Sequence, residues 1–76
     1  MWRKDINDAI LSYATEHWLK VAMLIVKAVE DQTIKFADGE DELSIIAEHI
    51  EHLVEDGALL SQGDLKQWRH SEVRKP

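Results

Sequence analysis

The chain has 76 residues, of which 45% are hydrophobic and 32% are charged, with a formal net charge of -6 at pH 7 and no cysteine. A chain this short builds one core and buries only about 60% of its unfolded surface, so we expect a single domain over residues 1–76 and do not expect a large enzyme pocket. The lack of cysteine excludes disulfides, thiol nucleophiles and cysteine-based metal sites. No stretch resembles a secretory leader or approaches the ~20 apolar residues of a membrane span, which predicts a cytoplasmic protein.

Two helices are predicted in the first half of the chain. Apolar residues recur at helical spacing from Trp2 to Tyr13, which predicts a helix over residues 5–13 with Asp5 as its N-cap. A second helix is predicted from a cap at Thr15 to about Glu30, with one continuous helix as the alternative. Between Trp18 and Val29 only two lysines interrupt the apolar residues. Such a helix must be covered on most of its sides.

The middle of the chain is predicted to hold a connection and a third helix. Residues 31–40 are rich in turn formers around a short strand-like segment at 34–36. Asp38 is the expected cap of the third helix, and Gly57 is the expected residue C′ just beyond its end. The apolar stripe of this helix follows steps of three and four: Leu43, Ile46, Ala47, Ile50, Leu53 and Val54.

Beyond Gly57 the pattern changes to two short strands, at about 58–62 and 68–74. Gly63 and Asp64 supply turn chemistry in the join, which has room for one helical turn capped by Asp64. The predicted fold class is therefore α+β and mainly helical, with three helices followed by a C-terminal two-stranded β-hairpin. This order also describes the back half of a winged-helix domain.

A family resemblance covers nearly the whole chain. The segments 62–65 (Gln-Gly-Asp-Leu) and 68–74 (Trp-Arg-His-Ser-Glu-Val-Arg) resemble the C-terminal signature of the bacterial family catalogued as domain of unknown function 3658. The segments 18–22 and 50–57 fit the same pattern. The resemblance implies a bacterial source and a related architecture, and it implies no activity because the family has none assigned.

Two clusters contain residue types used in catalysis. His49 and His52 are three residues apart on the third helix, a spacing that can bring two imidazoles to one metal ion, but a hydrolase would need a third ligand such as His17 or His70. The pair is expected on the solvated face, opposite the apolar stripe. His70 and Ser71 are neighbours on a strand and so point to opposite faces, which argues against a nucleophile and its base. We expect no catalytic, metal or cofactor site, and we expect Arg69, Glu72 and Arg74 to form salt bridges.

The charge pattern argues against nucleic acid. No lysine or arginine occurs from Ala37 to Leu65, while nine carboxylates do. In a winged helix the third helix would enter the major groove, where those carboxylates would face phosphate. Only the ends of the chain are basic, so a nucleic-acid-binding regulator remains an alternative that would depend on Arg69 and Arg74.

The apolar second helix gives the main functional hypothesis. One short chain has few layers to cover it, so we expect a protein-interaction or self-association module without catalytic chemistry, most simply a homodimer. The alternative is that Trp2, Tyr13, Phe36 and Trp68 complete the core within one chain. The predicted interface residues are Trp18, Leu19, Met23, Leu24, Ile25, Trp68, Arg69 and Arg74.

Overall fold

The computed structural model describes residues 3–76 and contains three α-helices and a small antiparallel sheet. The helices are α1 (Lys4–Tyr13), α2 (Val21–Val29) and α3 (Glu42–Glu55). The strands are β1 (Leu19–Lys20), β2 (Leu60–Gly63) and β3 (Ser71–Arg74), and a single 3-10 turn, η1 (Trp68–His70), precedes β3. The α+β prediction with three helices and a C-terminal hairpin is confirmed.

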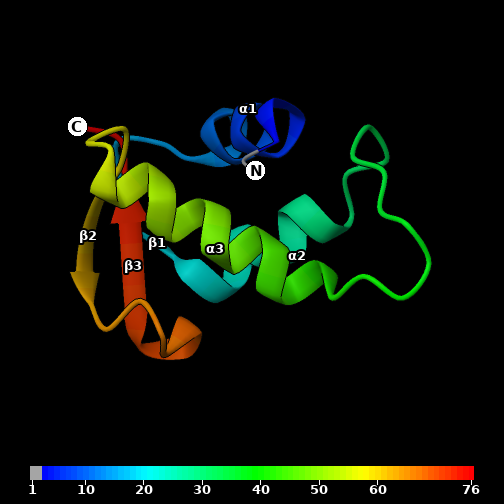
Figure 1. The fold of residues 1–76 in the computed structure, drawn as a ribbon. Helices are drawn as coiled ribbons and strands as arrows, with labels where there is room; N and C mark the ends of the chain where they lie inside the picture. Colours follow the sequence, from blue (N-terminus) through cyan, green and yellow to red (C-terminus); the bar gives the residue numbers. More distant parts are fainter. Residues whose placement is uncertain (1–2) are drawn as a thin grey trace.

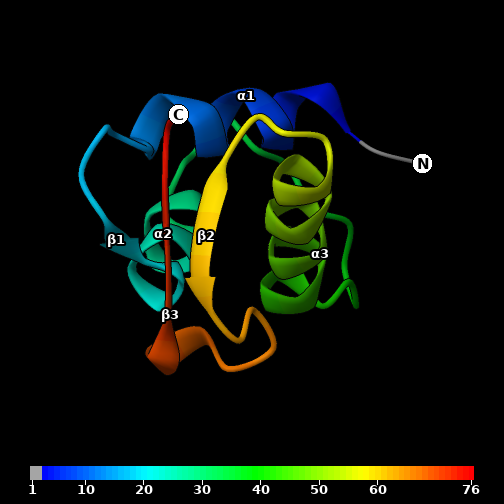
Figure 2. The same cartoon turned by 90° about the vertical axis from the view of Figure 1, so that its left-hand side faces the viewer.

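The three helices pack together and the sheet lies against one end of them (Figure 1). The sheet order is β1-β3-β2, and both pairs are antiparallel. Figure 2 shows β2 between β3 and α3. A strand between the first two helices thus joins the C-terminal hairpin in one three-stranded sheet, and the 64–70 connection of this hairpin is called the wing below.

The core is formed within the chain by side chains from every helix. Its largest fully buried members are aliphatic: Ile6, Ile10, Val21, Leu24, Ile25, Ile46, Ile50, Leu59 and Val73. Tyr13, Phe36 and Trp68 pack partly buried against these residues, as the single-chain alternative expected. Trp2, the fourth aromatic residue of that alternative, lies outside the described residues.

The predicted start of the second helix was wrong. Residues 14–20 are not helical, and α2 begins only at Val21. Leu19 pairs with Val73 and Lys20 with Glu72 in the sheet, while the Thr15 carbonyl accepts a hydrogen bond from the Lys75 N–H at 2.7 Å. Strand pairing with the C-terminal segment therefore satisfies backbone groups that a helix would otherwise have paired.

The N-caps predicted for the first and third helices were also wrong by a few residues. Arg3 occupies the N-cap position of α1, and the Asp5 carboxylate pairs instead with its guanidinium at 2.7 Å, which lowers the pKa of Asp5. α3 begins after Asp41 rather than Asp38, and the Asp41 carboxylate accepts bonds from the Ser44 N–H at 3.2 Å and hydroxyl at 2.8 Å. Asp41 is thus the carboxylate that is followed three residues later by a side chain with a hydroxyl donor.

The predicted end of α3 is confirmed. Gly57 has φ +84°, and the Gly57 and Ala58 N–H groups donate to the carbonyls of Val54 and Leu53. This is the Schellman arrangement, which favours glycine because its first residue beyond the cap is left-handed. It turns the chain directly from α3 toward β2.

The connection between α2 and α3 contains no strand at residues 34–36. Asp31 instead accepts hydrogen bonds from the Thr33 N–H at 2.8 Å and hydroxyl at 2.6 Å, which form a turn. Ile34 inserts into the core from this loop and is 6% exposed. The short apolar segment therefore anchors the loop as a single buried side chain.

No helix within residues 3–76 combines the length and the apolar character that a bilayer crossing needs.

Candidate protein-binding surfaces

One face of α2 belongs to the core and the opposite face is in water. Leu24 and Ile25 are 0% and 1% exposed, so these two predicted interface residues are core residues and the interface prediction needs correction there. Met23 and Val26 remain 50% and 48% exposed, one turn apart on the outer face. The apolar surface that α2 leaves open is therefore much smaller than its composition implied.

Trp18 and Arg74 form a second exposed feature near β1. Trp18 lies before β1 rather than on a helix, and the guanidinium carbon of Arg74 is 5.1 Å from the centre of its ring. Trp18 is 39% exposed, and Leu19 beside it is half-buried in the sheet. A cation–π contact thus joins two predicted interface residues that lie 56 positions apart in the sequence.

The remaining predicted interface residues lie at the wing. Trp68 is half-buried against the core, whereas Arg69 is exposed and its carbonyl accepts a hydrogen bond from Lys20 Nζ at 3.2 Å. The expected salt bridges among Arg69, Glu72 and Arg74 are not formed within the described chain. The Glu72 carboxylate instead accepts a bond from the Gln62 amide at 2.6 Å.

His49 does not lie on the solvated face of α3, where it was expected. His49 is 4% exposed and lies among the buried residues Ile46, Ile50 and Leu53, because position 49 shares their side of the helix. Its two ring nitrogens are hydrogen-bonded to backbone groups of Ile45 and Arg3. In residues 3–76 no three His, Asp or Glu side chains converge as a metal would require.

Ser71 is likewise structural. It is 1% exposed, and its hydroxyl donates to the Gln67 carbonyl at 3.0 Å, while His70 beside it is exposed. This bond ties the 64–70 connection to the start of β3.

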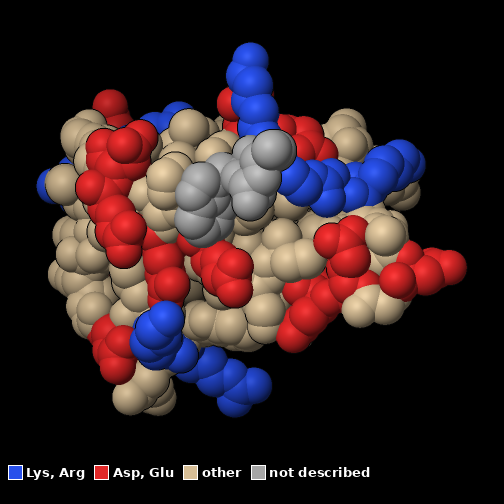
Figure 3. Space-filling view, viewed as in Figure 1, with Lys and Arg blue, Asp and Glu red and all other residues tan. Residues whose placement is uncertain are grey.

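Carboxylates cover the outer side of α3. Figure 3 shows them across this face, with lysine and arginine at its margins. Glu42, Glu48 and Glu55 are exposed, and Glu51 is half-buried beside Lys66. A duplex placed against α3 would meet these negative charges rather than the cations that release counterions.

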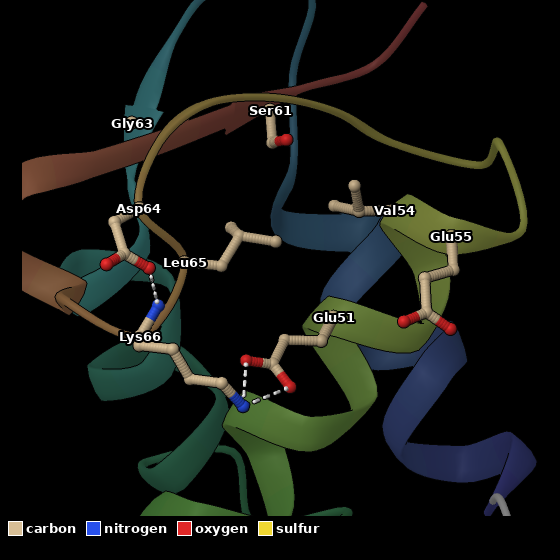
Figure 4. A pocket seen from close by; sticks show the side chains of 8 residues that line it. All are labelled: Glu51, Val54, Glu55, Ser61, Gly63, Asp64, Leu65 and Lys66. Atoms are coloured by element: carbon tan, nitrogen blue, oxygen red, sulfur yellow. Dashed lines mark hydrogen bonds and ion pairs between the residues drawn. The ribbon is translucent and has the colours of Figure 1, made fainter.

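A hollow of about 360 Å³ lies between α3 and β2. Figure 4 shows Glu51, Val54 and Glu55 of α3 on one side, Ser61 and Gly63 of β2 on the other, and the start of the wing closing one end. Lys66 Nζ lies 3.1 Å from Glu51 Oε1 at that end, and the Asp64 carboxylate accepts the Lys66 N–H at 2.9 Å. The hollow thus has an apolar part, Val54 and Leu65, and an acidic rim.

A smaller hollow of about 210 Å³ adjoins the first along α3 and shares Glu51 and Lys66 with it. Its other lining residues are Ser44, Ala47, Glu48 and Trp68. Glu51 and Lys66 therefore line two depressions on one acidic helix face.

Comparison with known proteins does not place the chain in a family. No family model matches it, and searches of curated proteins and of solved structures give no match either.

Sequence reasoning missed the hollow between α3 and β2. The carboxylates at 51, 55 and 64 were counted among the charges that oppose DNA, Asp64 was also assigned to a turn, and Ser61, Gly63 and Leu65 were assigned no binding role. Their proximity depends on how the hairpin folds back beside α3, for which the local sequence carries no signal.

Proposed function

We propose that this chain is a non-enzymatic protein-binding module, and that the outer face of α2 is a contact surface for a second copy. The observation that carries the proposal is the pair Met23 and Val26, large apolar side chains one turn apart and half exposed. Fully burying a large apolar side chain contributes about 1.5–3 kcal/mol. Because each of these two is already half buried, covering the rest in an interface would contribute about 1 kcal/mol for each. Symmetric pairing of such a face is the commonest route to a closed assembly.

Self-association is not needed to cover the core residues of α2. Because Leu24 and Ile25 are enclosed by their own chain, the fold does not need a partner to cover them. A dimer would then be reversible and concentration-dependent, not a condition for folding.

The test is the mass in solution across a concentration series, measured by sedimentation or light scattering. The monomer has a mass of 8.8 kDa, and we expect dimers at high micromolar concentration. Replacing both Met23 and Val26 by lysine should return the mass to that of the monomer. Leu43→Lys is the matched control, because Leu43 is similarly exposed, at 46%, but lies on α3. A wild-type chain that stays monomeric up to millimolar concentration would refute self-association.

A nucleic-acid-binding regulator is the second candidate, favoured by the winged-helix-like order and by two exposed cations of the wing, Lys66 and Arg69. Binding to mixed-sequence duplex DNA should then fall steeply as salt is raised, and Arg69→Ala should weaken it. Absence of binding at about 20 mM salt, where phosphate contacts are strongest, would eliminate this candidate.

A further inference from the structure

The outer edge of β2 is an open strand edge beside the acidic hollow. β2 pairs with β3 on one side, and within the described chain no strand occupies its other side. Figure 2 shows that this open side faces α3, and the hollow lies between the two elements. In an antiparallel pair, alternate residues of an edge strand direct their N–H and C=O groups away from the partner strand, so β2 presents backbone donors and acceptors to the hollow.

The sequence of β2 does little to protect this edge. Proteins blunt edge strands with lysine, proline or bulges, or cover them with a helix. Leu60–Gly63 contains no charged residue and no proline, pairs residue for residue with β3, is exposed throughout, and is separated from α3 by the hollow. Leu60 is 39% exposed at its start. The short length of the strand limits sheet-to-sheet aggregation but leaves room for an added segment of a few residues.

The charges around the hollow define the chemistry of an occupant. Glu51, Glu55 and Asp64 line it against a single cation, Lys66, which is already paired with Glu51. Glu55 and the adjacent Asp56 lie at the C-terminal end of α3, where the helix dipole disfavours negative charge, so helix stability does not explain them. Val54 and Leu65 supply an apolar wall for the methylene groups of a long side chain.

From these features we propose that β2 accepts an extended, basic segment of a partner protein as an added strand, with an arginine or lysine of that segment in the hollow between α3 and β2. Backbone pairing would hold the segment, and the carboxylates would select its charge. The inference rests on the proposed function only in that the chain binds protein, and it uses a different face from Met23 and Val26.

The probe is a capped Val-Arg-Val-Arg-Val peptide, titrated into the isotope-labelled 76-residue chain and followed by backbone amide shifts. We expect saturable shifts at residues 60–65 and at 54–55. The same peptide with glutamate in place of arginine should not bind. Of two peptides N-methylated at alternate residues, one should lose binding, because it lacks the donors that pair with β2.

Glu55→Gln should weaken binding about two- to fivefold, as expected for loss of one solvent-exposed charge pair. Asp38→Asn is the matched control, because it removes the same charge from the loop between α2 and α3, which Figure 1 shows at the end of α3 remote from β2. Equal weakening by both variants, or shifts spread over all carboxylates, would overturn the site in favour of nonspecific attraction.

Other outcomes separate this inference from the proposed function. If neither N-methylated peptide loses binding, strand addition is refuted. If the backbone amides of β2 are protected from hydrogen exchange in a dimer without peptide, the segment beside β2 comes from a second copy. The proposal that it is a basic segment of a partner is then refuted. Loss of dimers in the Met23 and Val26 variant with unchanged peptide binding would support both proposals independently, and dimers without peptide binding would refute only this one.

Discussion

The His49 ring connects the third helix to the start of the first. Its Nε2 accepts a hydrogen bond from the Arg3 backbone N–H at 3.0 Å, across 46 residues of sequence, and its Nδ1 donates to the Ile45 carbonyl at 2.7 Å. Because a backbone N–H only donates and a carbonyl only accepts, the neutral ring must carry its hydrogen on Nδ1. His49 therefore has a structural task that requires both nitrogens.

Replacing His49 by leucine should reveal that task. Leucine is similar in size but leaves the Arg3 N–H without its acceptor, so the free energy of unfolding should fall by about 1–3 kcal/mol. The measurement is urea denaturation followed by circular dichroism. The control is His70→Leu on the exposed turn η1, which should change stability by less than about 0.5 kcal/mol. Equal effects of the two variants would contradict the structural role.

Neighbouring positions of α2 should respond very differently to truncation. Leu24 is buried, so Leu24→Ala should cost about 2–5 kcal/mol, and Leu24→Asp should abolish folding. Met23 is half in water, so Met23→Ala should change the stability of the monomer by no more than about 1 kcal/mol. Thermal unfolding of dilute samples would compare them, and similar losses would contradict the observed orientation of α2.

The contact between Trp18 and Arg74 should be measurable as a coupling energy. A double-mutant cycle with Trp18→Leu and Arg74→Met should give about 0.5–1 kcal/mol, the usual strength of an exposed cation–π pair. The same cycle with Arg69→Met in place of the Arg74 change serves as the reference and should give a value near zero. A coupling no larger than that reference would show that the ring and the guanidinium do not stabilise each other.

Alanine substitutions should distinguish two glycines with the same backbone conformation. Gly57 and Gly63 both have φ above +80°, so alanine is strained at either by about 1–2 kcal/mol. Only at Gly63 would the added Cβ also overlap the His70 carbonyl oxygen. Gly63→Ala should therefore lower the unfolding midpoint in urea clearly more than Gly57→Ala, and the opposite order would contradict the hairpin geometry.

Acid should weaken the cap of α3. The hydroxyl and the N–H of Ser44 donate to Asp41 and hold the pKa of its carboxyl below its usual value. A lowered folded-state pKa means that the stabilisation is complete above the unfolded pKa of about 4 and is lost as the pH falls through the folded value. The melting temperature of the wild type should therefore exceed that of Asp41→Asn at pH 7, and the difference should shrink below about pH 4.

The control for this pH series is Asp38→Asn, which alters an exposed carboxylate that takes no hydrogen bond from residues 3–76. Its melting temperature should follow the wild type across the series. A difference between wild type and Asp41→Asn that stays constant with pH would contradict the capping role.

The sequence by itself determined the elements whose cues are local. Apolar spacing located α1 and α3, and Gly57 marked the end of α3, since periodicity and a left-handed cap are properties of a few adjacent residues. The absence of lysine and arginine from the middle of the chain likewise determined the acidity of the α3 face.

Only the tertiary structure decided which parts of distant segments meet. Residues 19–20 became a strand because β3 supplied partners, and the buried His49 ring accepts a hydrogen bond because the Arg3 N–H lies beside it. Leu24 and Ile25 were covered by the chain itself, whereas Ser61 came to lie across a hollow from Glu55. Each outcome depends on contacts between residues far apart in sequence, whose free energies no local pattern records.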